Sequence, residues 1–162
     1  MLKKFYFSVL FGLAITLTAC GDSSDISGSF PEGGYPEFSC KVTEGTDSDG
    51  TIWVQFKLNV PNRMGEVQKR SLKDGTELGY WERSYYNLSS KNQKLMCEDF
   101  EGDIKEELQS EDNGIEDHAC GNGVEYVHYK AQTEKQNLDS VKKMFEEECE
   151  DNQREWDEGD LD

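Results

Sequence analysis

Several residue types that catalytic and metal sites need are scarce in this chain. It has only two histidines, His118 and His128, and no Gly-x-Ser-x-Gly segment that would position a serine nucleophile. No two of its cysteines stand at the short spacing of zinc-binding knuckles. We therefore predict no catalytic residue, no metal ligand and no cofactor, and a protein that is not an enzyme.

Basic residues are also scarce. The chain has 17 lysines and arginines against 34 aspartates and glutamates, which gives a formal net charge of −17. Such a surface repels the phosphates of nucleic acids, so we expect no nucleic-acid partner. It also disfavours docking on anionic lipid headgroups. No second long apolar run follows the N-terminal one, so the sequence predicts no transmembrane helix downstream.

The N-terminus has the pattern of a secretory signal peptide. Lys3 and Lys4 precede an apolar run over residues 5–17. This run is shorter than the roughly 20 residues that a transmembrane helix needs. We therefore predict that residues 1–19 form a signal peptide that is removed after export.

The end of this signal, Leu17-Thr18-Ala19-Cys20, resembles the lipobox of bacterial membrane lipoproteins, and Gly21 suits the same pattern. The resemblance implies that Cys20 becomes the mature N-terminus and carries diacylglyceryl and palmitate-type acyl chains. Two or three acyl chains anchor a protein stably, whereas one chain binds a membrane only marginally. The expected location is the bacterial cell envelope, and the outer membrane in a diderm source, because position 21 is not Asp.

The cysteines other than Cys20 form an even set in a chain expected to be exported. Disulfides persist outside the cytosol and stabilise small domains with limited cores. Four cysteines allow three pairings, among which sequence alone does not choose. The arrangement that we favour ties the start of the fold to its last helix, with Cys97–Cys120 nested inside Cys40–Cys149.

Composition divides the mature chain into three parts. Residues 20–37 combine the lipidated N-terminus with a Gly-, Ser- and Pro-rich segment that we predict to be a flexible tether. Residues 38–151 form one disulfide-stabilised α+β domain. Residues 152–162 form an acidic tail that is expected to fray.

Alternation of apolar and polar residues predicts five strands. They cover residues 38–43, 52–60, 67–72, 78–86 and 124–131. In the second strand the even positions are apolar, so Trp53 is expected on the opposite face. Asp-Gly turns at residues 49–50 and 74–75 join the first four strands into two hairpins.

Two helices are predicted from apolar residues at helical spacing. The first begins after Ser89 or Ser90, and Gly102 weakens its middle. The second opens with the capping-box residues Thr133 and Gln136. Its apolar stripe is Leu138, Val141, Phe145 and Cys149.

The predicted class is α+β: a single domain with an antiparallel sheet of about five strands, two helices packed on one face and two disulfides. This coarse shape is similar to that of small bacterial lipoproteins, and such a likeness transfers no site.

Aromatic residues of the predicted sheet are the best candidates for a binding face. We single out Trp53, Trp81 and Tyr85, with Tyr80 and Tyr86 nearby. Aromatic rings on a sheet face can stack on sugars or form a platform for a protein. The alternative is that these rings pack beneath loops or a helix.

Acidic segments suggest other sites. Residues 46–50 resemble part of a calcium loop, but an EF-hand register would put Gly45 and Phe56 where carboxylates belong. Half of residues 98–117 are acidic, which suits a solvated loop or a loose divalent-cation site. Paired carboxylates could also serve glycoside cleavage.

The expected function is that of a lipid-anchored cell-envelope protein. It would be a non-catalytic binding or structural module that acts on an envelope protein or a glycan. The alternatives are an envelope hydrolase that uses paired carboxylates and a loose divalent-cation binder.

Overall fold

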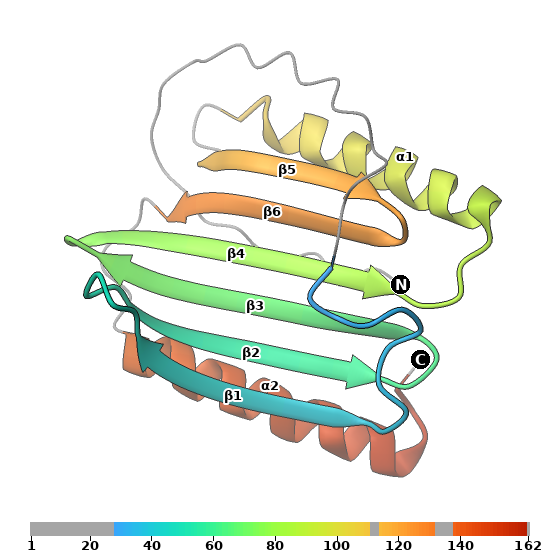
Figure 1. Cartoon of the computed structure of the whole chain (residues 1–162), viewed down its shortest axis with the longest axis horizontal. Coiled ribbons are helices and arrows are strands. Elements are labelled where there is room, and N and C mark those ends of the chain that lie inside the picture. The colour runs from blue at the N-terminus through green and yellow to red at the C-terminus, as the bar shows by residue number, and fades with distance from the viewer. Residues whose placement is uncertain (1–27, 111–113, 132–137, 162) are drawn as a thin grey trace.

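The computed structural model describes residues 28–110, 114–131 and 138–161, which form a six-stranded sheet and two helices (Figure 1). In chain order the elements are β1 (Ser39–Thr46), β2 (Ile52–Val60), β3 (Met64–Lys73), β4 (Thr76–Tyr85), α1 (Ser90–Glu107), β5 (Ile115–Gly121), β6 (Val124–Ala131) and α2 (Leu138–Glu158). The strand order is β1-β2-β3-β4-β6-β5, and every neighbouring pair is antiparallel. The predicted α+β domain is confirmed, with one strand more than expected.

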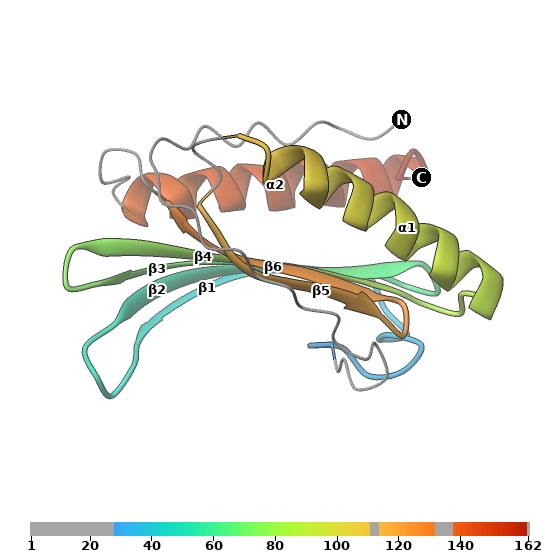
Figure 2. The ribbon, with the colours of Figure 1, turned by 90° about the horizontal axis from the view of Figure 1, so that it is seen from above.

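Both helices lie on one face of the sheet, as predicted (Figure 2). Helix α2 covers the β1 and β2 edge, where Val141 and Phe145 pack on the buried even-numbered residues of β2. Helix α1 covers the other edge, where Phe100 and Ile104 pack with Val127 of β6. The domain therefore has two separate apolar cores, and the central strands β3 and β4 run between the helices.

Each helix is cross-linked to the edge strand beneath it. Cys40 of β1 is bonded to Cys149 of α2, and Cys120 of β5 is bonded to Cys97 of α1. The first bridge joins residues 109 apart in sequence, and the second joins residues 23 apart. The nested pairing favoured from the sequence is thus confirmed.

The two predicted hairpins are present. In the tight β3–β4 turn, Asp74 and Gly75 both have positive φ, 50° and 79°. Two-residue turns of this kind need positive φ at both central positions, which Asp-Gly adopts readily. Strand β3 begins at Met64, three residues before the predicted start, and pairs with β2 from Met64 to Leu72.

The predicted tether differs from the structure over its described part. The backbone amide and hydroxyl of Ser29 donate hydrogen bonds to the buried carboxylate of Glu82, at 2.6 and 2.7 Å. The Asn59 side chain donates to the carbonyl oxygens of Tyr35 and Glu37. Residues 28–37 therefore lie against the sheet face opposite the helices, so the folded domain begins before residue 38. The polar contacts that hold them come from distant strands.

The acidic stretches also contain more regular structure than expected. Helix α1 starts after its predicted cap, since the Ser89 hydroxyl accepts from the Asn92 amide, and it continues through Gly102. Strand β5, which was not predicted, follows at Ile115. Helix α2 extends past residue 151 to Glu158, into the predicted acidic tail. The predicted capping box at residues 133–136 lies outside the described residues.

The extension of α2 has a packing cause. The Trp156 ring stacks on Phe38 with a centroid separation of 5.0 Å and an interplanar angle of 11°. This contact ties the last turns of α2 to the residue just before β1. Neither described helix is long and apolar enough to cross a membrane.

Candidate functional site

The strand register separates the three aromatic residues of the predicted binding face. Directly opposed residues of antiparallel strands point to the same side of a sheet, and successive residues alternate. Trp81 is opposite Gln68, which is opposite the core residue Phe56, so Trp81 faces the helices. Tyr85 shares its side, whereas Trp53 lies on the other face, as its strand pattern predicted. The three aromatic candidates therefore do not share one face of the sheet.

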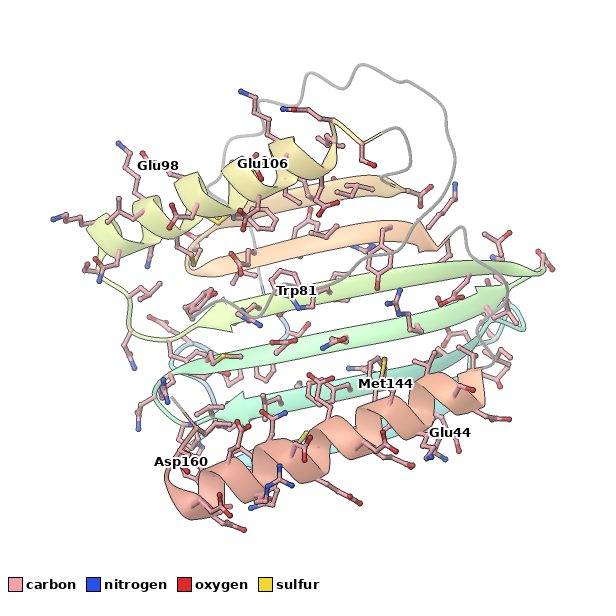
Figure 3. The ribbon with its side chains drawn as sticks, turned by 180° about the vertical axis from the view of Figure 1, so that it is seen from behind. Glu44, Trp81, Glu98, Glu106, Met144 and Asp160 are labelled. Atoms are coloured by element: carbon pink, nitrogen blue, oxygen red, sulfur yellow. A yellow bond between two sulfur atoms is a disulfide. The ribbon has the colours of Figure 1, made fainter. Side chains whose placement is uncertain are left out.

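The helix-bearing face of the central strands forms what we call the interhelical strip. Figure 3 shows Trp81 on β4 between α1 and α2, where it lies within the strip. By register its members are Glu66, Gln68, Arg70, Trp81, Arg83, Tyr85, Glu125 and Tyr129. The same face of neighbouring β2 carries Val54, Phe56, Leu58 and Val60 under α2. The strip is therefore polar and aromatic where the sheet beneath the helices is apolar.

A carboxylate organises the centre of the strip. Glu66 is only 4% exposed and accepts hydrogen bonds from Arg83 at 2.6 and 3.1 Å, from Trp81 Nε1 at 3.2 Å and from Gln68 at 2.9 Å. Burial lowers the pKa of Arg83, but the charge and hydrogen bonds of Glu66 outweigh burial and hold that pKa above its ordinary value. The indole and the guanidinium are thus fixed in place by one shared acceptor.

Both strip arginines lie over aromatic rings. The Arg83 guanidinium is 5.2 Å from the Trp81 ring centroid, and the Arg70 guanidinium is 4.6 Å from that of Tyr129. The Tyr129 ring lies over Gly79, where any Cβ would overlap the ring. Stacking of this kind restricts the arginines while leaving them partly exposed.

A titratable acid lies at the α1 side of the strip. Burial raises the pKa of Glu125 to about 7, and the positive charge of Arg83 and a hydrogen bond from Tyr85 oppose this rise. The Tyr85 hydroxyl donates to Glu125 Oε1 at 3.2 Å. Asp103 of α1 adds a repulsion that also raises the pKa of Glu125. The protonation state of this edge therefore changes near neutral pH.

Helix α2 borders the strip on the other side. Glu148 accepts a hydrogen bond from Gln68 at 3.5 Å, so its side of the helix faces the strip. Met144 lies one turn earlier on the same side, and it is 45% exposed (Figure 3). An exposed thioether thus stands at the margin of a rigid polar and aromatic surface.

The acidic turn considered for calcium has structural partners. Asp47 accepts from Trp53 Nε1 at 2.9 Å, and Asp49 pairs with Lys73 at 2.6 Å. Hydrogen bonds from Lys73 and Thr51 hold the pKa of Asp49 well below its usual range. These carboxylates brace the β1–β2 hairpin and its neighbour. Among the residues that the structure describes, no group of three or more His, Cys, Asp or Glu side chains could hold a metal ion.

The two histidines lie apart. His118 of β5 is on the helix side, 3.5 Å from a Glu101 oxygen, whereas His128 of β6 is on the opposite face. There its ring lies 4.7 Å from that of Tyr80 and 5.5 Å from that of Tyr126. The fold therefore does not bring the histidines into one site.

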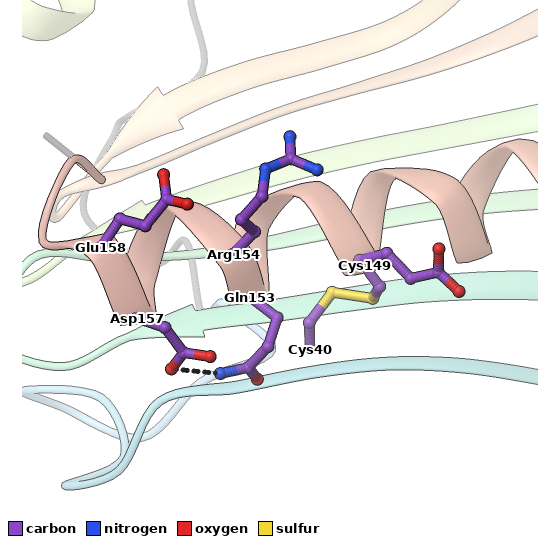
Figure 4. Close-up of a pocket in the computed structure, with 7 residues that line it drawn as sticks. Cys40, Cys149, Gln153, Arg154, Asp157 and Glu158 are labelled. Atoms are coloured by element: carbon purple, nitrogen blue, oxygen red, sulfur yellow. Dashed lines mark hydrogen bonds between the residues drawn. A yellow bond between two sulfur atoms is a disulfide. The ribbon is translucent and has the colours of Figure 1, made fainter.

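One hollow in the described surface lies beside the Cys40–Cys149 disulfide. It has a volume of about 470 Å³ and is lined by Cys40, Cys149, Glu150, Gln153, Arg154, Asp157 and Glu158 (Figure 4). Gln153 donates to Asp157 within it at 3.0 Å, and its charged side chains are exposed. A second hollow of about 240 Å³ lies near Trp53 at the β1–β2 hairpin. Neither hollow has the convergent buried polar groups that ligand pockets use.

Sequence patterns missed the charged members of the strip. Glu66, Gln68 and Arg70 alternate with Val67 and Lys69, so the strand can be recognised by period but not by an apolar face. The usable signal is register, since these residues lie opposite Leu58, Phe56 and Val54.

Comparison of the chain with family models, with curated proteins and with solved structures finds no match in any of the three. No relative therefore assigns a role to the strip.

Proposed function

We propose that this protein is a lipid-anchored module of a bacterial cell envelope that binds a partner without catalysing a reaction. Its binding face is the interhelical strip. The proposed partner is an envelope protein or a glycan that presents both polar and apolar groups. The lipid on Cys20 would hold the module at a membrane, and α1 and α2 would flank the bound partner.

One observation carries the proposal: the residue types of the strip. Tryptophan, tyrosine and arginine dominate the energetic hot spots of protein interfaces. Trp81, Tyr85, Arg70 and Arg83 occur together between the helices and are each partly exposed. Their hydrogen bonds and ring contacts hold them in place before binding, which reduces the ordering cost that association otherwise carries.

The strip supports binding better than it supports hydrolysis. Glycoside cleavage needs two carboxyl groups that reach the substrate from either side. Glu66 and Glu125 are 4% and 6% exposed, and Glu66 is already engaged by three side chains. A pKa near 7 suits Glu125 as a general acid, but its burial keeps it from a bound sugar.

The anchor and location are supported by the N-terminal motif and by the cysteines. The lipobox-like residues 17–20 place one cysteine at the cleavage position. The four remaining cysteines are all in disulfides, a state typical of exported proteins. Mass spectrometry of native protein should find acyl chains on an N-terminal Cys20, and a Cys20→Ala variant should lack them. An unacylated native N-terminus would refute the anchor.

Photo-crosslinking in cells tests the binding face. A photoreactive amino acid at Met144 would stand beside the strip, whereas one at Glu146 of the same helix would point about 160° away around the helix axis. We expect an adduct of discrete mass from position 144 and none from position 146. An Arg70→Glu substitution should remove the adduct. Equal adducts at both positions, or none at position 144, would contradict the proposal.

A further inference from the structure

Three lysines on neighbouring strands of this acidic protein point to the sheet face opposite the helices, which we call the open face. By register, Lys41 of β1, Lys57 of β2 and Lys69 of β3 all point to that side. We call these three residues the lysine triad. Helix α1 carries six acids and three bases, and α2 carries nine acids and three bases. The acidic charge of the helices therefore lies on the other side of the sheet.

The triad is not neutralised within the fold. Lys41 and Lys57 are directly opposed across β1 and β2, an arrangement of like charges that destabilises a sheet. The Lys57 ammonium lies over the Phe30 ring at 4.6 Å, and the Lys69 ammonium lies over the Trp53 ring at 4.8 Å. Among the described residues, no carboxylate is within 4.0 Å of a triad ammonium. Within the described residues, three neighbouring lysines therefore have no carboxylate at ion-pair distance, although the sequence has 34 acids.

Several other charged groups of the open face are paired or buried within the fold. Lys130 pairs with Glu116, and Lys73 pairs with Asp49. The Glu82 carboxylate is 2% exposed and is hydrogen-bonded to Ser29, which keeps it from the surface. Asp117 lies at the far β5 edge, where it accepts from Tyr126. Exposed Glu32 and Glu37 lie on the segment that crosses this face, and Asp47 accepts from Trp53 on the same face.

The chain enters the fold at the same face. Gly28 lies against Ser84 and Val124, and the Ser29 carbonyl oxygen accepts a hydrogen bond from Lys57 at 3.2 Å. Figure 2 shows this first described segment on the side away from both helices. Seven residues lie between Cys20 and Gly28, which makes eight steps along the chain, so even a fully extended chain would place the entry point within about 28 Å of a lipid on Cys20.

We propose that the lysine triad docks the open face on the anionic headgroups of the membrane that holds the Cys20 lipid. The inference rests on the proposed anchor and adds the orientation of the domain above the bilayer. The net charge of −17 disfavours such docking for the protein as a whole. Charges are screened beyond about 8 Å at physiological salt, however, so the headgroups respond to the nearby triad and little to the acidic helices. Each lysine near such a surface contributes about a fivefold preference. The interhelical strip then faces away from the membrane, toward the side from which a partner could approach.

The three tryptophans allow a direct test, because they lie on different sides. Mature protein (residues 20–162) would be coupled through the Cys20 thiol to a maleimide lipid, in vesicles of phosphatidylcholine with or without phosphatidylglycerol. A nitroxide on a fraction of the headgroups quenches nearby indoles. One variant keeps only Trp53 (W81F/W156F), and the other keeps only Trp81 (W53F/W156F). We expect stronger quenching of Trp53 than of Trp81 when phosphatidylglycerol is present, and loss of this difference at high salt.

Charge-matched variants separate orientation from general attraction. Changing the triad to glutamine should abolish the preferential quenching of Trp53. Changing three exposed lysines of the helices, Lys91, Lys94 and Lys143, removes the same charge and should leave the preference intact. Equal quenching of the two indoles, or an unaltered preference in the triad variant, would overturn the proposal. A response of Trp53 to soluble polygalacturonate with no response to vesicles would overturn it in favour of an acidic glycan.

The chemical coupling keeps the two proposals separate. It supplies the lipid whether or not cells attach one, so a failure of orientation leaves the native anchor standing. Conversely, an unacylated Cys20 in cells would refute the anchor even if the coupled protein docked as expected.

Discussion

Removal of the outer disulfide is expected to destabilise the domain more than removal of the inner one. In the chain-entropy model the effect of a cross-link grows with the logarithm of the loop that it closes. The Cys40–Cys149 loop of 109 residues corresponds to about 5 kcal/mol at 25 °C. The Cys97–Cys120 loop of 23 residues corresponds to about 3 kcal/mol. The inner bridge shortens the outer loop by 23 residues, which changes the estimate little because the dependence is logarithmic.

Guanidinium denaturation followed by circular dichroism measures both effects. The variants are C40A/C149A and C97A/C120A, with Cys20→Ser in every protein so that no free thiol can exchange. Domains of this size are stable by roughly 5–15 kcal/mol, so the outer variant should lose a large share of its stability and the inner one less. An equal loss, or a larger loss for the inner pair, would refute the loop-length reasoning and show that helix packing dominates.

Three further substitutions test the strip and the segment crossing the open face. Burial raises the pKa of Glu125 from 4.5 to about 7, so the folded state holds a proton that the unfolded chain releases, and stability should fall as pH rises through this window. Glu125→Gln should remove that fall and raise the free energy of unfolding at pH 8 by up to about 3 kcal/mol, measured by urea denaturation. An unchanged pH dependence of stability in this variant would contradict the raised pKa of Glu125. Gly79→Ala should cost about 1–3 kcal/mol, because its methyl group would displace the Tyr129 ring, and an unchanged melting temperature would contradict this packing. Ser29→Ala removes a donor to buried Glu82 and should cost about 1–3 kcal/mol, whereas a loss below 0.5 kcal/mol would show that the segment contributes little.

The parts of the fold under a helix could be predicted from sequence. Strand β2 alternates strictly because α2 buries one of its faces, and the stripe of Val141 and Phe145 has helical spacing because it covers that face. The Asp74-Gly75 turn was predictable because few residue pairs adopt its two positive φ angles. In each case a local pattern reflects a buried neighbour or a backbone constraint.

Strand β5 was not predictable, because its order of apolar and polar residues does not reveal which of its residues are buried. It is an edge strand whose first half includes the exposed residues Glu116 and Asp117, so acidity hides the strand period. The segment containing Ser29 has the composition of a linker, and its contacts with Glu82 lie 53 residues away. Long-range polar contacts of this kind leave no local signal.

The candidate site was only partly predictable. Trp81 and Tyr85 were identified as aromatic candidates, but their face depends on the register between strands, which the sequence did not supply. Arg70 and Glu66 diluted the apolar pattern of β3, and this dilution marks the part of the sheet that neither helix covers. A weak apolar pattern in a strand that pairs with a strongly alternating one is therefore informative about where a surface remains available.

The nested disulfides have a consequence for how the chain matures. In an exported chain the cysteines cross the membrane in the order 40, 97, 120, 149. An oxidase that joined each cysteine to the next would pair Cys40 with Cys97 and Cys120 with Cys149, and neither pair is native. The native pairs require either that Cys40 stays reduced until α2 arrives or that an isomerase exchanges the bonds afterwards. For an exported chain, this connectivity would make maturation sensitive to the thiol-exchange machinery, on a timescale of seconds to hours.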